Sequence, residues 1–155
     1  MKKAVRDQTT CPIAYTANII GDPWSLLIAR DIVFYGKRTY GEFLSSNEGV
    51  TTSMLADKLV NLEIQGLLTK AADTIDKRKV IYSLTNKGLD LFIPLLVEMA
   101  NWGVAYNPLI ISNSAWVKQA AIDKNKLVVL VRQTVVKGGS VLNGGDSVMK
   151  QLERG

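Results

Sequence analysis

The stretch between residues 39 and 66 constrains the fold more than any other, because it holds two short helical patterns separated by a turn. Thr39 is followed three residues later by Glu42, which is the capping-box signature of a helix start. Residues 45–50 form a polar turn, and the hydroxyl residues 51–53 then offer an N-cap to a longer segment. That segment carries one apolar stripe, formed by Leu55, Leu59 and Leu62. Two short helices joined by a tight turn predict a helix-turn-helix.

A β-hairpin is predicted directly after this unit, since two segments of strand type flank a polar, charged tip over residues 73–79. The second segment is the clearer one, because it contains the β-branched and aromatic cluster Val80-Ile81-Tyr82. Gly66 separates the hairpin from the preceding helix. A hairpin in this position is a wing. The sequence therefore predicts a mainly α-helical chain with a small β-hairpin wing, which is a winged helix-turn-helix.

Two helical patterns precede this unit. The first runs from Pro12 to Ile20 and stops at Gly21. Asp22 and Pro23 then provide an N-cap and a first helical residue for a helix over residues 24–35. We expect one side of this helix to be buried, formed by Leu27, Ile28, Ile32 and Tyr35. Arg30 and Asp31 are interpreted as a solvated or paired edge of the same helix.

A long helix is predicted over residues 86–102, with Thr85 as its cap and with two apolar faces. One face consists of Leu89, Phe92, Ile93 and Leu96. The other consists of Leu91, Leu95 and Trp102. A small domain usually buries only one face of such a helix, so the second face, with Ile13 of the first helix, predicts a dimer seam.

The chain is predicted to have three parts: a polar arm over residues 1–10, a winged helix-turn-helix and dimerisation domain over residues 11–106, and a dimer-associated C-terminal extension over residues 107–155. Residues 115–121 and 123–137 of the extension have helical length and polar spacing. The β-branched residues of the second segment are also compatible with a strand, and we favour a helix. The glycine-rich stretch 138–146 is interpreted as a flexible turn.

Enzymatic and metal-binding functions are disfavoured because the chain has no histidine and a single cysteine, Cys11. One cysteine cannot close a disulfide within the chain, and the usual Cys and His ligands of zinc are missing. The Ser-His-Asp and Cys-His catalytic sets are excluded as well, and the acidic residues fall in no recognisable catalytic motif. We therefore expect no enzyme, no metal and no cofactor.

A cytoplasmic protein without a membrane partner is expected, because the longest apolar run, Leu127–Val131, is too short to cross a bilayer. The N-terminal lysines are not followed by the apolar run of a signal peptide. The net charge of +5 and the isoelectric point near 9.4 are compatible with a polyanionic partner.

A set of ordered motifs between residues 11 and 103 resembles the HxlR-type regulators, which are bacterial winged helix-turn-helix proteins of MarR-like architecture. In chain order the motifs are Cys11-Pro12, Ile20-Gly21 with Trp24, Leu26-Leu27-Ile28 with Arg30, Leu59 with Leu62-Glu63 and Gly66-Leu67, Tyr82-Ser83-Leu84-Thr85-Asn86-Lys87-Gly88, and Trp102-Gly103. No single motif is specific, whereas the ordered set is. The resemblance implies a homodimeric, sequence-specific transcriptional regulator acting on an inverted-repeat operator, with residues 11–106 as its DNA-binding and dimerisation domain.

The resemblance also implies which residues meet double-stranded DNA: the start of the helix over residues 52–65 enters the major groove, and the wing meets phosphates or the minor groove. The candidates are Thr51, Thr52, Ser53, Met54 and Lys58 in the helix, Lys70, Lys77, Arg78 and Lys79 in the wing, and Lys37, Arg38 and Tyr40 beside the groove. In the alternative interpretation, Thr51 or Thr52 caps the helix and Tyr40 belongs to the core. Lys58 is the only base between residues 51 and 66, unlike in many family members, so phosphate contact shifts to the wing.

Cys11 is the candidate redox-sensing residue. With Pro12 at the first helical position, the thiol lies at a helix N-terminus, where free N–H groups and the helix dipole favour an anion. A thiolate is the reactive form of cysteine. The resemblance implies sensing of an oxidant or electrophile, since several family members use a thiol at this place, and the alternative is a small apolar packing residue.

A second function from another class stays open because the recognition helix is poor in bases. In that alternative the chain is a winged-helix module that binds a protein partner or a small-molecule effector and has little affinity for DNA. The two functions differ in their expected affinity for DNA and in its salt dependence.

Overall fold

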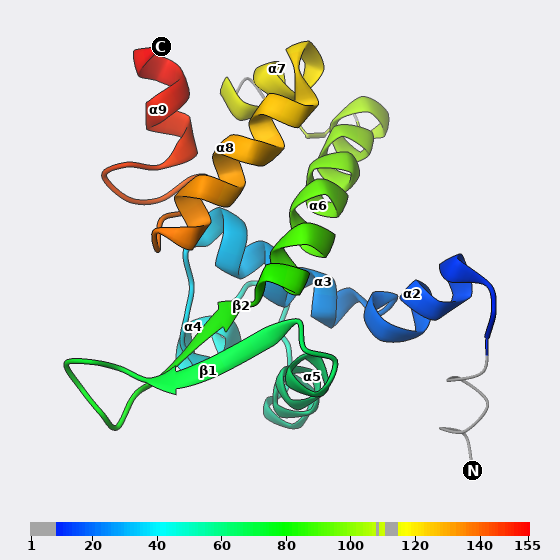
Figure 1. The fold of residues 1–155 in the computed structure, drawn as a ribbon, viewed down its shortest axis with the longest axis vertical. Helices are drawn as coiled ribbons and strands as arrows, with labels where there is room; N and C mark the ends of the chain where they lie inside the picture. Colours follow the sequence, from blue (N-terminus) through cyan, green and yellow to red (C-terminus); the bar gives the residue numbers. More distant parts are fainter. Residues whose placement is uncertain (1–8, 108, 111–114) are drawn as a thin grey trace.

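The computed structural model describes residues 9–107, 109–110 and 115–155, and within them the chain is mostly helical with one two-stranded antiparallel sheet (Figure 1). The N-terminal half contains α2 (Pro12–Ile20), α3 (Pro23–Arg30), the π-helix η1 (Asp31–Tyr35), α4 (Tyr40–Leu44) and α5 (Thr52–Ile64). The remainder contains β1 (Leu68–Ala72), β2 (Val80–Leu84), α6 (Asn86–Tyr106), α7 (Ala115–Ile122), α8 (Lys124–Val136) and α9 (Val148–Arg154). Residues 1–8 of the predicted arm lie outside the described residues.

The helix-turn-helix consists of α4 and α5, and its helices begin where the capping residues predict. The Thr39 hydroxyl accepts a hydrogen bond from the Glu42 backbone N–H, and the Glu42 carboxylate accepts one from the Thr39 backbone N–H at 2.8 Å, which completes the capping box. Thr51 caps α5 by accepting a hydrogen bond from the backbone N–H of Met54 at 3.3 Å. The stripe of Leu55, Leu59 and Leu62 is buried, as predicted.

The wing is an antiparallel hairpin in which Leu68 pairs with Leu84 and Ala72 pairs with Val80. The charged tip over residues 73–79 connects the strands, as predicted. A backbone hydrogen bond from Tyr82 N to Arg38 O, at 2.7 Å, ties β2 to the segment before α4. The hairpin is therefore attached to the helix-turn-helix through its backbone and through the buried side of its strands.

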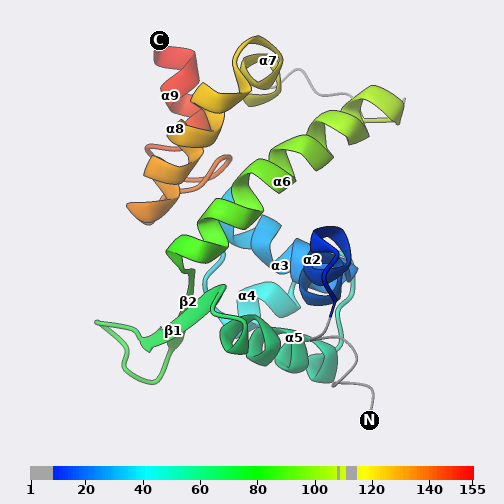
Figure 2. The ribbon, with the colours of Figure 1, turned by 45° about the vertical axis from the view of Figure 1, so that its right-hand side comes forward.

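The core lies between α3, α5 and α6. Its fully buried large side chains include Ile32, Phe43, Leu55, Phe92 and Ile93. In Figures 1 and 2, α7, α8 and α9 lie at one end of the molecule, and α4, α5 and the hairpin lie at the other. Helix α6 connects the two ends. By length and composition α6 is apolar enough to span a membrane, which is also true of many core helices. In this structure its buried face packs on α3, and α8 also lies against it.

The helix predicted over residues 24–35 differs from the structure in its second half. It begins with the Asp22 cap as expected, but the α-helical pattern gives way to η1 at Asp31. Gly36 then ends the segment in the left-handed conformation, at φ +73°. Tyr35, predicted to face inward, is 41% exposed and is the last residue of η1, directly before Gly36. The long helix predicted to end near residue 102 continues to Tyr106.

The C-terminal extension is helical, and the strand alternative for residues 123–137 is wrong. The side chain of Asp123 caps α8, and Leu127, Val131 and Val135 form a buried stripe at a spacing of four residues. The glycine-rich stretch is more than the flexible turn that was predicted. Val141 is fully buried there, and the backbone N–H groups of Val141 and Leu142 donate to the carbonyls of Val33 and Phe34 in η1, each at 2.9 Å.

Candidate nucleic-acid interface

The first turn of α5 presents the side chains of Thr51, Thr52, Ser53 and Met54, all of which are exposed. Thr51 uses its hydroxyl as the helix cap, so the capping alternative is correct for this residue. The Tyr40 hydroxyl donates to the carbonyl of Thr52 at 2.9 Å, and this bond fixes the start of α5 against α4. Tyr40 is half-buried, so it is neither a fully exposed candidate for DNA contact nor a fully buried core residue.

The joint between α5 and α6 explains Thr85, Lys87 and Gly88 of the Tyr82-to-Gly88 motif. The Thr85 hydroxyl donates to the carbonyl of Gly66 at 2.6 Å, and the Lys87 ammonium donates to the carbonyl of Gln65 at 2.9 Å. A Cβ atom on Gly88 would lie 2.2 Å from the carbonyl oxygen of Leu67, so only glycine permits this approach. The motif therefore fixes the end of α5 to the start of α6 and sets the orientation of α5.

The tip of the wing presents Lys77, Arg78 and Lys79 as exposed side chains. Arg78 is 92% exposed at its side chain, and its guanidinium lies 3.1 Å from the carboxylate of Asp76. The hydrogen bond from the Arg78 side chain lowers the pKa of Asp76, and a second hydrogen bond, from the Arg78 backbone N–H to the same carboxylate, acts in the same direction. Asp76 therefore stabilises the turn at the tip, while the three cationic side chains remain exposed to solvent.

Two other lysines of the candidate set form ion pairs. The ammonium of Lys58 lies 3.4 Å from the Asp22 carboxylate, and that of Lys70 lies 3.4 Å from Glu63. Both pairs are partly exposed, and such pairs contribute little to stability and exchange readily with other partners. Lys58 and Lys70 are therefore available to an incoming phosphate only in competition with these acids.

Arg38 was predicted to contact DNA, and in the structure its guanidinium is directed into the molecule. It donates to the carbonyl oxygens of Ile32 at 2.9 Å, Lys37 at 3.1 Å and Gly139 at 3.4 Å. Burial lowers the pKa of Arg38, although the nearby Glu42 carboxylate acts in the opposite direction. These contacts give Arg38 a structural task at the point where η1, the helix-turn-helix and the C-terminal loop meet.

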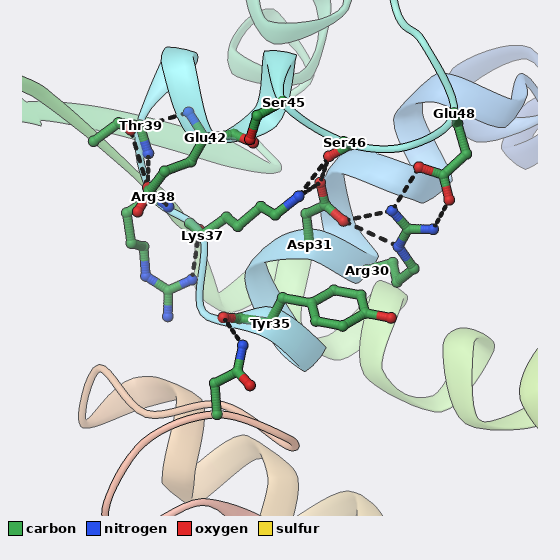
Figure 3. A network of polar contacts seen from close by, with 11 residues as sticks. Arg30, Asp31, Tyr35, Lys37, Arg38, Thr39, Glu42, Ser45, Ser46 and Glu48 are labelled. Atoms are coloured by element: carbon green, nitrogen blue, oxygen red, sulfur yellow. Dashed lines mark hydrogen bonds and ion pairs between the residues drawn. The ribbon is translucent and has the colours of Figure 1, made fainter. Parts of the chain in front are cut away.

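Lys37 belongs to a partly buried polar network that the sequence interpretation missed (Figure 3). Asp31 is at its centre and is only 2% exposed. Its carboxylate accepts from Arg30 Nη2 at 2.6 Å, from Lys37 Nζ at 3.1 Å and from the Ser46 hydroxyl. The prediction that Asp31 is paired is correct, and the alternative, that it lies on a solvated edge of the helix, is wrong. Its position three residues after the buried Ile28 is the helical spacing that indicates this burial.

Arg30 extends the same network to the turn between α4 and α5. Its guanidinium donates to both carboxylate oxygens of Glu48. The hydrogen bond from Arg30 lowers the pKa of Glu48 to about 2, and this effect exceeds the opposing effect of burial. Because Ser46 and Glu48 both lie in the turn, the network holds the turn, and with it α5, against α3.

The predicted dimer seam lies on one apolar surface formed by α2 and α6. Ile13 is 79% exposed and Trp102 is 67% exposed, while Leu91 and Leu95 are half-buried. An open apolar groove between the two helices is lined by Pro12, Ile13, Thr16, Ala17, Leu95 and Met99, among others. Trp102 and Tyr106 stack at 5.1 Å between ring centroids at the end of α6. Exposed apolar area of this kind typically marks an interaction surface.

Cys11 is exposed and occupies the N-cap position of α2, as predicted. Its side chain makes no capping hydrogen bond, while its backbone N–H donates to the Thr9 hydroxyl at 3.2 Å. The thiol is two residues from the exposed Ile13. Among the described residues, no group of three His, Cys, Asp or Glu side chains is placed to hold a metal ion.

Comparison with known proteins relates this geometry to a family. The model of the HxlR-like helix-turn-helix family matches residues 19–110. The uncharacterized HTH-type transcriptional regulator YdzF of Bacillus subtilis is 33% identical over 94 residues, which are 61% of this chain and 85% of YdzF. The crystal structure of PA1607 aligns with 37% identity and a TM-score of 0.63, over 71% of this chain and 76% of that one. The redox regulator HypR in its oxidized form aligns with 30% identity and a TM-score of 0.56, over 63% of this chain and 98% of HypR. The chain thus belongs to the HxlR-like helix-turn-helix family and is a transcriptional regulator of the helix-turn-helix type.

Proposed function

We propose that the protein acts in the cytoplasm as a homodimer on an inverted-repeat operator, with the first turn of α5 in the major groove and the wing tip against the DNA backbone. The observation that carries this proposal is the joint exposure of two elements: the polar first turn of α5 and the cationic wing tip. Both lie at the end of the molecule opposite α7–α9 (Figure 2). The rigid attachment of α5 through Tyr40, Thr85 and the Asp31 network supports reading of a fixed base sequence.

Each part of this surface has a different task in the proposal. Thr52 and Ser53 offer hydroxyls to base edges or phosphates, and Met54 offers an apolar contact to a thymine methyl group. Lys77, Arg78 and Lys79 neutralise phosphates, with Lys58 and Lys70 contributing when their ion pairs exchange. Arg38 and Lys37 act by holding the interface in shape.

The homodimer in this proposal forms through the apolar surface of α2 and α6. Ile13, Leu91, Leu95 and Trp102 lie on that surface and would be covered by the same residues of the second copy. Two α5 helices in successive major grooves on one side of DNA are about 34 Å apart. A two-fold dimer therefore requires an inverted repeat with that spacing between half-site centres.

A fluorescence-anisotropy titration tests the operator proposal. Labelled DNA from upstream of the protein's own gene is compared with a shuffled duplex of equal length at several salt concentrations. We expect the natural sequence to bind about a thousandfold more tightly or better, which is the lower end for specific regulators. Equal affinity for both duplexes at every salt concentration would exclude a sequence-specific regulator.

Cys11 is the proposed sensor of an oxidant or electrophile. Its exposure at the N-cap of α2, beside the proposed dimer surface, supports this role, and so does the similarity to the redox regulator HypR. A disulfide requires a second thiol, either a small free thiol or Cys11 of the second copy, because the chain has no other cysteine. Modification would shift the dimer geometry, and thereby the spacing of the two α5 helices, if it favours one arrangement energetically.

The sensor proposal is tested by treating the wild type and Cys11→Ser with diamide in the presence of glutathione. Diamide accepts two electrons and two protons from the two thiols that become the disulfide. We expect DNA release from the wild type, reversal by dithiothreitol, and no response from Cys11→Ser. The same response from both proteins would show that Cys11 is not the sensor.

A protein partner is the second candidate function, and a specific feature of α5 favours it. The exposed side of α5 beyond its first turn carries Asp57, Val60 and Ile64, which is an acidic and apolar surface. Such a surface suits a protein better than a phosphate backbone. The titration above separates the candidates, because a protein-binding module would show weak affinity for both duplexes.

A further inference from the structure

An apolar cavity lies between the helix-turn-helix core and the C-terminal extension, and no residue of α5 or of the wing lines it. It adjoins the apolar groove between α2 and α6, with which it shares Leu26 and Met99. Its volume is about 460 Å³. Its walls come from α3, η1, α6, α7 and the loop before α9, and include Leu27, Phe34, Tyr35, Leu96, Trp116 and Leu142. This volume is within the range of small-molecule sites, which are commonly lined by apolar and aromatic side chains.

The cavity exists because α6 has small residues on the side that faces it. Ala100 and Gly103 both line the cavity and are three residues apart, so they lie on one face of α6. A Cβ atom on Gly103 would meet only the Ile110 side chain, at 3.9 Å, which shows that space remains there. Opposite, Phe34 and Trp116 meet edge to face, with ring centroids 5.1 Å apart. The rings provide the faces and edges that an aromatic guest would contact.

The charge of the cavity limits which molecules fit. Arg30 is the charged residue among those that line it, and its guanidinium is already bound by the carboxylates of Asp31 and Glu48. An anionic guest would have to compete with these two acids, and a cationic guest would meet no free acid on the wall. We propose that this cavity binds a neutral aromatic small molecule.

The cavity is formed jointly by the family domain and by the extension of this chain. Trp116 and Leu142 lie outside the residues matched by the family model, whereas Phe34 and Tyr35 lie within them. The same loop that supplies Leu142 donates hydrogen bonds to the carbonyls of Val33 and Phe34. A guest would therefore contact η1, directly before the helix-turn-helix, and the loop that supports it.

The test uses a matched pair of fluorescent probes on the full-length protein. N-phenyl-1-naphthylamine is neutral, and 8-anilinonaphthalene-1-sulfonate is the same molecule with an added sulfonate. We expect saturable binding of the neutral probe with one molecule per chain, and weaker binding of the sulfonate. Glu48→Gln should reduce the difference in affinity between the two probes. The substitution removes one of the two carboxylates that bind Arg30, so the sulfonate can pair with this guanidinium more easily. Absence of saturable binding by the neutral probe, or a preference of the wild type for the sulfonate, would overturn the proposal.

Two alanine-to-leucine variants of α6 locate the site. Ala100→Leu fills the cavity and should weaken binding of the neutral probe by about tenfold or more, because overfilling a packed space is costly. Ala105→Leu, on the exposed side of the same helix, should bind as the wild type does. Circular dichroism and the thermal midpoint establish that both variants are folded. If folded Ala100→Leu keeps full affinity, or instead changes only the oligomeric state, the probe binds elsewhere and the cavity is not the site.

Discussion

Asp31 is a carboxylate removed almost completely from water, which is costly unless its charge is matched by well-placed donors. Three residues meet this requirement: Arg30 donates from both Nε and Nη2, and Lys37 and Ser46 donate once each. These residues come from α3, from the segment before α4 and from the turn before α5. A single buried carboxylate therefore connects three segments whose relative positions decide where α5 lies.

Replacement of Asp31 by alanine should destabilise the fold strongly, because it leaves Arg30 and Lys37 without their common acid. We expect a loss of about 2–3 kcal/mol in the free energy of unfolding, measured by urea denaturation, because the Arg30 and Lys37 side chains are 24% exposed and Arg30 keeps Glu48 as a partner. Asp90→Ala is the matched control, since Asp90 is an exposed acid that pairs with Arg132 on the surface. That control should lose less than about 1 kcal/mol. Similar losses in the two variants would mean that the network contributes no more than a surface pair.

Glu48 makes the stability of the turn depend on pH. Its pKa in the folded state is about 2, below the ordinary glutamate value of 4.5, and the hydrogen bond from Arg30 is the main cause. A lowered folded-state pKa means that the ion pair stabilises the fold above pH 4.5 and that this contribution disappears as the pH falls toward 2. Urea midpoints between pH 6 and 2 should therefore fall less steeply for Glu48→Gln than for the wild type. Parallel curves would contradict this assignment.

At the scale of elements, the starts of helices could be predicted from single residues, and the interruption of one helix could not. Asp22, Thr39, Thr51 and Thr85 cap helices at the positions that the sequence indicates, because a cap depends on neighbours two or three residues away. The π-helix η1 has a long-range partner instead. Its carbonyls at Val33 and Phe34 accept hydrogen bonds from residues 141 and 142, more than a hundred positions later.

The wing and α5 should contribute differently to DNA binding if the proposed function is correct. Arg78→Ala should weaken binding to the natural and shuffled duplexes alike and lower the slope of log K against log salt by about one. Ser53→Ala should leave that slope unchanged and weaken only the natural duplex. Lys150→Ala, an exposed lysine on α9 far from the wing, is the charge-matched control and should leave binding unchanged. If Arg78→Ala and Lys150→Ala weaken binding equally, Arg78 contributes only through the net charge of the protein and the wing makes no direct contact with phosphates.

At the scale of the whole molecule, the candidate interface could be predicted from the sequence where its residues are exposed, and not where they turn inward. Thr52, Ser53 and the wing cations lie where motif and hairpin place them. Arg38 was predicted to lie on the same surface from its place just before α4. Its hydrogen bond to the carbonyl of Gly139, 101 positions later, cannot be predicted from local sequence. Periodicity identifies helices, but it does not show which distant loop meets which helix end.

The attachment of the extension leads to a prediction about cooperativity. Val141 is fully buried and its backbone bonds to η1, so it is one of the points at which residues 115–155 are attached to the rest, beside the packing of α8 on α6. Val141→Asp would bury an unpaired charge there, which the fold can avoid only by releasing the loop. In hydrogen exchange, we expect amides of α8, α9 and η1 to lose protection, while amides of α5 and the hairpin keep most of theirs. Val129→Asp, on the exposed side of α8, should change none of these amides. Uniform loss of protection across the chain in Val141→Asp would show instead that the extension and the helix-turn-helix unfold as one unit, and that the extension is part of the DNA-binding fold itself.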